Sequence, residues 1–192
     1  MSLLDKFGRE FMSYPQSKWR KLAFKAPLVL WRMGLGPVLG HHVLVITAKG
    51  RKTGLPRHTM TEFHVLNGKI YVPCAFAPKA QWYKNIMADP RVTVQTWQGA
   101  EAMTATRVTD DAELLAVTEL MRKNNPVMLD WYFDTKGVTP TPEDILVNKD
   151  SLYFLRFDAT DEPTPFPLEA DLAWIWPVLL VLALLKRRKR KS

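Results

Sequence analysis

The sequence predicts an α+β fold, mainly β, in which about six short strands form a small antiparallel barrel. Short β-branched and aromatic runs recur through the middle of the chain, and turn residues separate them. Asn67-Gly68 lies between two of these runs and is a strong signal for a tight hairpin. The chain contains neither a Gly-x-Gly-x-x-Gly nor a Walker sequence, so a doubly wound nucleotide-binding fold finds no support.

The composition is that of an ordinary globular chain. The 192 residues are 47% hydrophobic and 24% charged, which excludes disorder as the main state. The single cysteine, Cys74, excludes a disulfide framework and a multi-thiolate metal site. His41 and His42 are adjacent on a predicted strand, so their side chains point to opposite faces and make a poor metal pair. We therefore predict no metal site.

Composition divides the chain into three parts. Residues 1–39 are predicted to form an N-terminal amphipathic helix and a connector. Residues 40–158 form the central barrel domain, and residues 159–192 form a Pro-rich linker, an apolar helix and a basic tail. The first helix has an apolar arc and a separate stripe of cations, namely Lys18, Lys21, Lys25 and Arg32. Such a helix suits a membrane interface or a cleft in the body.

The elements of the central domain follow from hydrophobic period and turn signals. Strands are expected at 43–48, 59–66, 69–75, 92–97, 102–108 and 152–157. Helices are expected at 78–88, at 110–123 behind the N-cap Asp110, at 126–135 as a short helix or ordered loop, and after Thr141. Helices inserted between hairpins are typical of a small barrel.

The C-terminal part carries fourteen uncharged residues, 172–185. As a helix this run is about 21 Å long, against a hydrocarbon core of about 30 Å. We expect it to lie in the cytoplasmic leaflet of the cell membrane, or to enter it partway, with the basic residues 186–191 at the headgroups. The alternative is a buried helix of the domain followed by a solvated basic tail.

The net charge of +8 is concentrated at the two ends of the chain. Residues 186–191 contribute +6 and residues 1–33 contribute +5, so −3 is left for residues 34–185. The body is therefore no basic nucleic-acid binder. Basic ends beside apolar runs indicate a membrane lipid surface as partner, and a membrane-protein partner is also considered.

One predicted hairpin carries an unusual cluster of cations at its turn. Four cations, Lys49, Arg51, Lys52 and Arg57, lie among two glycines and the hydroxyl of Thr53. Backbone N–H groups in such turns can cup an anion, and the cations would neutralise phosphate or carboxylate oxygens. A solvated turn explains the charge equally well.

A second informative stretch is the predicted helix at 78–88. Trp82 and Tyr83 offer flat faces to a planar ring, but aromatic side chains more often fill a core. Pattern alone favours the core.

The two stretches together resemble the deazaflavin-dependent nitroreductase family, also described as deazaflavin-dependent quinone reductases. The first motif reads Thr47, Gly50-Arg51-Lys52-Thr53-Gly54, Pro56-Arg57, and the second runs from Trp82-Tyr83-Lys84-Asn85 to Pro90 and Val92. The resemblance covers residues 40–130. It implies a split β-barrel of the flavin-reductase type that binds coenzyme F420, with the phosphate and glutamate tail on the basic turn. The implied cofactor contacts are Arg51, Lys52, Thr53, Arg57, Thr59, Met60, Thr61, Glu62, Pro73, Cys74, Ala75, Phe76, Lys79, Gln81, Trp82, Tyr83 and Asn85.

The resemblance also implies hydride transfer from the reduced coenzyme to a quinone or nitro-type acceptor, such as a lipid quinone. A donor is needed where charge develops on the acceptor oxygen. Tyr132 is the first candidate and His64 the second. The chain departs from the family at Ala75-Phe76-Ala77, where a hydroxyl and a lysine are common, and at Met128, which replaces a tyrosine.

Two alternatives stay open: a non-catalytic accessory or assembly subunit of a membrane complex, and an FMN- or haem-binding relative. The oligomeric state is also open.

Overall fold

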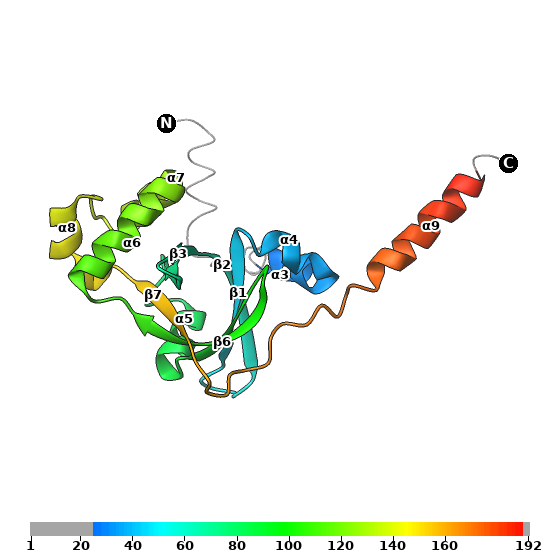
Figure 1. Cartoon of the computed structure of the whole chain (residues 1–192), viewed down its shortest axis with the longest axis horizontal. Coiled ribbons are helices and arrows are strands. Elements are labelled where there is room, and N and C mark those ends of the chain that lie inside the picture. The colour runs from blue at the N-terminus through cyan, green and yellow to red at the C-terminus, as the bar shows by residue number, and fades with distance from the viewer. Residues whose placement is uncertain (1–24, 190–192) are drawn as a thin grey trace.

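The computed structural model describes residues 25–189, and the strands in this range form one antiparallel sheet (Figure 1). The strands are β1 (Val43–Lys49), β2 (Pro56–Glu62), β3 (His64–Leu66), β4 (Lys69–Pro73), β5 (Arg91–Thr96), β6 (Gly99–Arg107) and β7 (Phe154–Ala159). Their order is β2-β1-β5-β6-β7-β4-β3. β2 also contacts β4, so the sheet curls toward closure as a barrel does. The prediction of an α+β chain built on antiparallel strands is confirmed.

The helices lie around this sheet in two groups (Figure 1). They are α3 (Ala26–Leu30), a π-helix (Trp31–Leu35), α4 (Gly36–Leu39), α5 (Gln81–Ala88), α6 (Asp111–Asn124), α7 (Pro126–Asp134), α8 (Pro142–Val147), a 3-10 turn (Lys149–Ser151) and α9 (Ile175–Lys189). Helices α6, α7 and α8 gather at one end of the body, and α3 and α4 lie at the other (Figure 1).

The sheet separates two hydrophobic cores. The inner core combines β1, β4, β5, β6 and β7 with α5, and the outer core joins the sheet to α6, α7 and α8. β4 contributes to both because successive side chains on a strand point to opposite faces: Val72 packs in the inner core and Tyr71 in the outer one. Helix α5 packs on the inner core and contacts β1 and β2.

The hairpin prediction at Asn67-Gly68 is confirmed. Leu66 and Lys69 are paired across the turn, and both central residues have positive φ, 51° and 77°. Two positive φ angles are what a two-residue turn of this kind needs.

The predicted strand 59–66 is divided by Phe63 into β2 and β3. These two strands lie at opposite ends of the sheet order. Phe63 packs against the inner core, so the chain turns there and changes its strand partner. Residues 34–40, predicted as a connector, are largely helical, with Gly34 at φ 86° where two helical segments meet. The predicted N-terminal amphipathic helix lies mostly outside the described residues.

Residues 160–173, which we call the strap, lie against the outside of β5. The side-chain amide of Gln95 donates to Leu168 O at 3.1 Å and accepts from Leu168 N at 2.7 Å. Thr93 contacts Thr164 and Pro165. Arg32 forms a two-point ion pair with Asp171 near the end of the strap. The strap is thereby joined to both β5 and the helical segment after α3.

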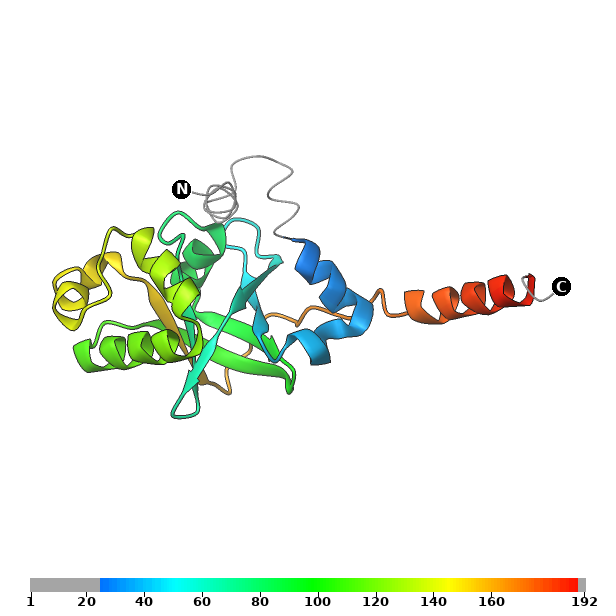
Figure 2. The same ribbon diagram turned by 90° about the horizontal axis from the view of Figure 1, so that it is seen from above.

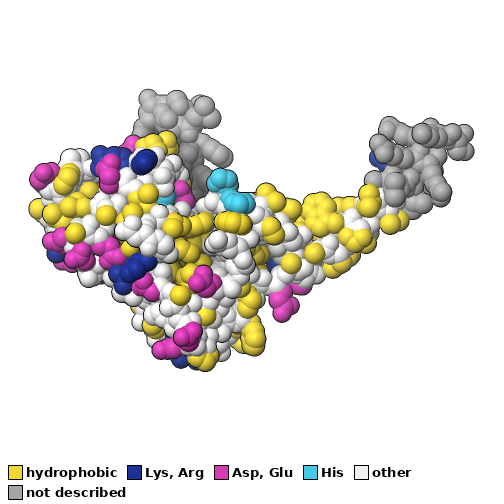
Figure 3. Space-filling view, in the orientation of Figure 1, with side chains coloured by type: hydrophobic (Ala, Val, Ile, Leu, Met, Phe, Trp, Pro, Cys, Tyr) yellow, Lys and Arg dark blue, Asp and Glu magenta, His cyan; other side chains and the backbone are white. Residues whose placement is uncertain are grey.

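Helix α9 projects away from the body (Figures 1 and 2). Hydrophobic side chains cover its described part in the space-filling view (Figure 3), and Trp174, just before it, and Leu180 are 61% and 62% exposed. Among the residues that the structure describes, no helix has the length and apolar character needed to cross a bilayer. The predicted location at the cytoplasmic side of a cell membrane through this helix is therefore wrong.

Candidate functional site

The basic turn joins β1 to β2 and is closed by its own backbone. Gly50 N donates to Leu55 O at 2.9 Å, and Gly54 N donates to Gly50 O at 2.7 Å. A Cβ on Gly50 would lie 3.0 Å from Leu55 O and from Thr53 Oγ1, so a glycine is needed at this close approach. Gly54 has φ 71°, in the left-handed region. These two glycines shape the turn and leave its side chains pointing outward.

Arg51 connects the turn to α5. Its guanidinium donates to Asn85 Oδ1 at 2.8 Å and to Gln81 Oε1 at 2.8 Å. Asn85 is only 6% exposed, and its Oδ1 also accepts from Arg51 N at 3.3 Å. The sequence placed these three residues in one cofactor site, and the structure brings them together although they come from two separate motifs.

The other cations of the turn have few partners. Lys52 is exposed and its side chain forms no hydrogen bond or ion pair within the described part of the chain. Arg57 donates to Thr53 Oγ1 at 3.3 Å, and neither it nor Arg51 forms an ion pair with a described residue. Three cations therefore share one hairpin end without a carboxylate to neutralise them. A multiply charged anion is the ligand that such a surface favours.

The aromatic pair of α5 divides between core and surface. Tyr83 is 5% exposed and packs edge-on against Tyr153, with 5.6 Å between ring centroids. Burial raises the pKa of the Tyr83 hydroxyl. Trp82 is half-buried against the inner core. Trp82 is therefore the ring of this pair with surface left for a ligand.

The site residues predicted on β2 lie on its two faces. In an antiparallel ladder, directly opposite residues project to the same side. Arg57, Thr59 and Thr61 pair with the inner-core residues of β1, whereas Met60 and Glu62 pair with Val45 and Val43 on the other side. Of these residues, only Arg57, Thr59 and Thr61 project to the face of β2 that carries the inner core. Trp82 packs against the same core.

The chain after β4 forms a turn beside α7. Phe76 packs edge-on against Trp131 of α7, with ring centroids 5.9 Å apart, and Pro78 follows a cis peptide bond. Cys74 is fully buried, so its thiol lies in the core, and burial raises its pKa. Pro73 and Ala75 are half-buried and Lys79 is exposed.

Lys136 comes from beyond α7 and supports this turn. Its ammonium donates to Ala77 O at 3.0 Å and lies 5.0 Å from the centre of the Tyr153 ring. Partial burial lowers the pKa of Lys136. The sequence lacks the family's lysine in the turn itself, and Lys136 brings a cation to the same segment from a distant position.

Tyr132 is not placed to act on an acceptor. It is 0% exposed, its hydroxyl accepts from Tyr153 N at 2.7 Å and donates to Tyr153 O at 3.2 Å. Burial strongly raises its pKa. The hydroxyl of Tyr132 already donates one hydrogen bond and accepts another within the fold. It therefore has no free hydrogen to donate to an acceptor molecule.

His64 is also buried, at 4% exposure, and lies on β3, which pairs with β4 and contacts α6, rather than at the basic turn. Its Nε2 is 3.9 Å from Glu62 Oε1. Glu62 accepts a hydrogen bond at 2.8 Å from Asn125, the N-cap of α7. Asn125 was missed by the sequence reasoning, although an Asn before a Pro is a signal for a helix start.

A cavity of about 590 Å³ lies on the other side of β2, between α3 and the strap. Leu28, Val29 and Leu168 give it apolar walls, and His58 of β2 reaches it. His58 is bonded to Thr47 Oγ1 at 2.9 Å, and burial, followed by the charge of Arg32, lowers its pKa. This cavity is separate from the cations of the basic turn.

The described residues contain no cluster of His, Cys, Asp and Glu that could hold a metal ion.

Comparison with known families gives a match. The model of the F420H(2)-dependent quinone reductase family matches residues 33–140. This range includes the basic turn, α5, the turn after β4 and α7.

Several solved structures are similar to the chain at low identity. An F420-H2 dependent reductase (FDR-A) is 19% identical, with a TM-score of 0.47 over 60% of this chain and 93% of that one. The haem storage protein HutZ from Vibrio cholerae is 13% identical, with a TM-score of 0.45 over 71% of this chain and 91% of that one. An FAD-binding protein from Mesorhizobium loti is 16% identical, with a TM-score of 0.38 over 62% and 82%. No curated protein matches the chain.

Proposed function

Because the chain belongs to the F420H(2)-dependent quinone reductase family, we propose that it transfers a hydride from reduced coenzyme F420 to a quinone or a similar small apolar acceptor. The family is one of oxidoreductases, which favours an enzyme over an accessory subunit, and its match gives no support to the FMN alternative.

The observation that carries the proposal is the basic turn. Arg51 is fixed by Gln81 and Asn85, while Lys52 and Arg57 lie exposed beside it with no acidic partner among the described residues. A coenzyme with a phosphate and a glutamate tail presents several negative charges in a row. The donor set therefore fits this end of the coenzyme. Residues 34–185 have a net charge of −3, so the local excess of cations is not a property of the whole body.

The residues present also fit the ring of the coenzyme. Trp82 is a half-buried aromatic surface one helical turn from Asn85, and Thr59 and Thr61 project to the same side of β2 as the inner core. Bound there, the reduced deazaflavin would supply the hydride. The chain itself would orient the ring between β2, α5 and the turn after β4, and would exclude water with Phe76 and Trp131.

We propose a small apolar acceptor because the groups around the turn after β4 are mainly hydrophobic. Phe76 and Trp131 are both half-buried, and Met128 is at the start of α7 where the family has a tyrosine. Thioether and aromatic surfaces favour a flat apolar molecule over a charged one.

A titration of the purified full chain with oxidised coenzyme F420, followed by fluorescence, tests binding directly. We expect Lys52→Gln and Arg57→Gln each to raise the dissociation constant by about five- to tenfold, because each removes one charge-assisted contact. The binding should weaken with added salt. Lys123→Gln is the matched control: Lys123 is exposed on α6 and forms no ion pair with a described residue.

A steady-state assay with reduced coenzyme F420 and a soluble naphthoquinone then tests turnover. We expect quinone-dependent formation of the oxidised coenzyme, and no turnover when reduced FMN replaces it. Equal binding by wild type and both turn variants, or binding of FMN in preference to the deazaflavin, would contradict the proposal. Binding without turnover on any quinone would favour the accessory subunit.

A further inference from the structure

One ring nitrogen of the buried His64 on β3 has no hydrogen-bond partner among the described residues. The side chain of His64 is 3% exposed, and its Nε2 has no hydrogen-bond partner among the described residues. A buried polar atom without a partner is destabilising, so such an atom in a folded protein requires an explanation.

The carboxylate of Glu62 is close to that nitrogen, with its Oε1 3.9 Å away. This distance is too long for a hydrogen bond, but a side-chain rotation that shortens it by about 1 Å would make one. Glu62 is 23% exposed, so it touches solvent where His64 does not. The pair thus has one member that can exchange protons with water and one that is enclosed.

Glu62 is also bonded to the helix that follows α6. Asn125 Nδ2 donates to Glu62 Oε1 at 2.8 Å, while Asn125 Oδ1 accepts from Met128 N at 3.2 Å and so caps α7. One oxygen of Glu62 therefore lies between the imidazole of His64 and the first turn of α7.

This position is on the α7 side of the proposed site. Glu62 ends β2 and projects to the face opposite to Thr59 and Thr61. The helix to which Glu62 is bonded, α7, also carries Met128 and Trp131, the groups proposed to face the acceptor. Two-electron reduction of a quinone to a hydroquinone takes up one hydride and one proton. On oxidation the bound coenzyme would give up this hydride and also an N–H proton, which would pass to solvent. A group of the protein is then needed to deliver a proton to the acceptor oxygen, and the overall reaction stays balanced.

We propose that Glu62 and His64 form a proton-holding pair that supplies this proton, and that Asn125 is a positioning residue that fixes Glu62 against α7. The proposal rests on the proposed function. The proton leaves the pair for the oxygen of the reduced acceptor, and a proton from solvent replaces it at the exposed edge of Glu62.

The surroundings of the pair are consistent with this role. Burial lowers the pKa of His64, and the charge of Glu62 opposes the effect. Across the ladder His64 lies opposite Tyr71, whose hydroxyl donates to Glu113 of α6, and Glu113 is itself paired with Arg156 of β7. The charges beyond Tyr71 are thus neutralised by one another, and Glu62 remains as the group that acts on the imidazole.

The first test needs no coenzyme. The pKa of His64 is measured by NMR in the full chain, with the signal assigned through His64→Gln. We expect Glu62→Gln to lower the pKa of His64 by about one unit, because the imidazolium loses its neighbouring anion. Glu119→Gln, an exposed carboxylate on α6, should leave it unchanged. An unchanged pKa in Glu62→Gln overturns the pair.

The second test is the pH profile of quinone reduction. In wild type kcat should fall as pH rises through the apparent pKa of the pair, and in Glu62→Gln and His64→Gln it should be about 100-fold lower and nearly independent of pH. Asn125→Ser keeps a capping residue but removes the bond to Glu62, so we expect a smaller loss of kcat with an unchanged melting temperature. Parallel pH profiles in all variants would refute proton supply by the pair. If wild type reduces no quinone, the proposed function and the proton supply both fail, and the NMR titration still decides whether the pair exists.

Discussion

At the scale of single residues, the proposed site depends on how firmly Arg51 is held. Its guanidinium reaches two acceptors on α5, Gln81 Oε1 and Asn85 Oδ1, each at 2.8 Å. A planar fork can serve both at once, whereas a lysine ammonium can reach only one in good geometry. Arg51 therefore orders the turn that carries the free cations as well as adding a charge to it.

We expect Arg51→Lys to raise the dissociation constant of coenzyme F420 by about tenfold and to lower the free energy of unfolding by about 1 kcal/mol. Fluorescence titration and urea unfolding measure the two effects. Lys52→Arg is the control, because it keeps the charge at a position whose side chain has no hydrogen bond or ion pair in the described part of the chain. Equal losses in both variants would mean that charge alone matters at this turn.

The buried His64 and the half-buried His58 predict how stability depends on pH. His58 and His64 both have pKa values lowered from 6.5, mainly by burial, so the unfolded chain binds their protons more readily than the folded one. The free energy of unfolding should be at its full value above about pH 6.5 and should decrease as the pH falls toward the folded-state values. Urea unfolding between pH 5 and 8 checks this, and His58→Gln combined with His64→Gln should flatten the slope.

Site residues could be predicted from the sequence where they lie in a local motif. They could not be predicted where their contacts join positions far apart along the chain. Arg51, Gln81 and Asn85 belong to two motifs, and the family resemblance placed them in one site. Lys136 and Ala77 are 59 positions apart, and no local pattern joins them. Tyr132 was predicted from its position near the family's tyrosines, but its hydroxyl is bonded to the backbone of Tyr153, a contact that depends on tertiary packing.

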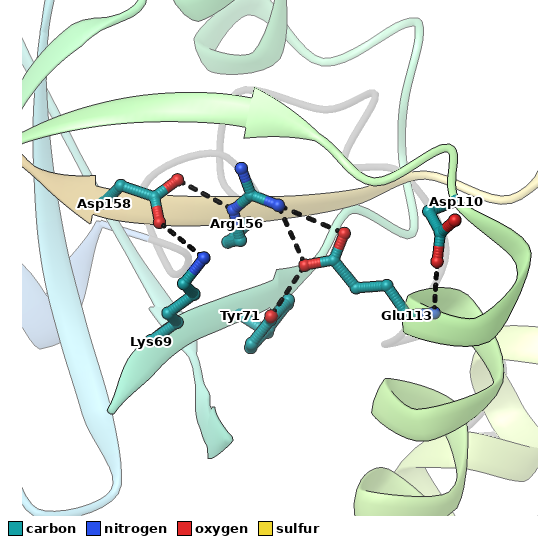
Figure 4. Close-up of polar contacts among 6 residues, drawn as sticks. All are labelled: Lys69, Tyr71, Asp110, Glu113, Arg156 and Asp158. Atoms are coloured by element: carbon teal, nitrogen blue, oxygen red, sulfur yellow. Dashed lines mark hydrogen bonds and ion pairs between the residues drawn. The ribbon is translucent and has the colours of Figure 1, made fainter. Parts of the chain in front are cut away.

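At the scale of elements, one polar network joins α6 to the sheet (Figure 4). Glu113 of α6 accepts from Tyr71 on β4 at 2.7 Å and from Arg156 on β7 at 3.0 Å. Arg156 also pairs with Asp158, which lies 3.3 Å from Lys69. Burial and the bond to Glu113 raise the pKa of Tyr71 to about 12. The network fixes α6 to β4 and β7 at the edge of the outer core. In the sheet, β5 and β6 lie between β7 and the β1–β2 hairpin that carries the basic turn.

We expect Glu113→Gln to lower the free energy of unfolding by about 1–2 kcal/mol, because a charged acceptor shared by two partly buried donors is lost. The pKa of Tyr71 should fall in the same variant. Urea unfolding and a spectrophotometric tyrosine titration are the measurements. Glu101→Gln, an exposed carboxylate on β6, is the control. No change in either quantity would mean that solvent screens this network fully.

The elements themselves were largely predictable, and their arrangement was not. Hairpins such as β3–β4 and β5–β6 follow from local turn signals. The pairing of β7 with both β4 and β6 joins residues about 50 to 85 positions apart, and no short pattern encodes it. The break at Phe63 was missed for the same reason, since only the packing of its ring against the inner core shows that one apolar run is two strands.

At the scale of the whole molecule, the packed body extends to the end of the strap, and α9 projects away from it (Figures 1 and 2). Among the described side chains of α9, Trp176 contacts the rest of the chain through its Nε1, which donates to Met33 O at 2.7 Å. Val178, Leu179 and Leu180 are each about half exposed or more. An apolar surface of this kind on a free helix favours self-association.

We expect a chain that ends after Ala173 to keep its melting temperature and its coenzyme affinity, and to lose the concentration-dependent association of the full chain. Light scattering after size exclusion measures association.

A chain that ends after Ala159 also loses the strap, which leaves the buried side chains of Thr93 and Gln95 without their partners. Its melting temperature should be lower by about 5 °C or more. Similar melting temperatures for the two truncations would show that the strap adds no stability.

The place of β7 in the sheet has a consequence for how the protein is made. Among the strands that the structure describes, β7 comes last along the chain, yet in the sheet it lies between β6 and β4. Until residue 159 has been synthesised, the growing chain can hold only two separate pieces, β2-β1-β5-β6 and β4-β3, each with a bare inner edge. Unpaired strand edges attract other chains, so the nascent protein is most exposed to misassembly just before β7 is synthesised. The basic turn and α5 lie in the first half of the chain and are translated early, so the groups that would bind the coenzyme are made well before the strand that completes the sheet around them.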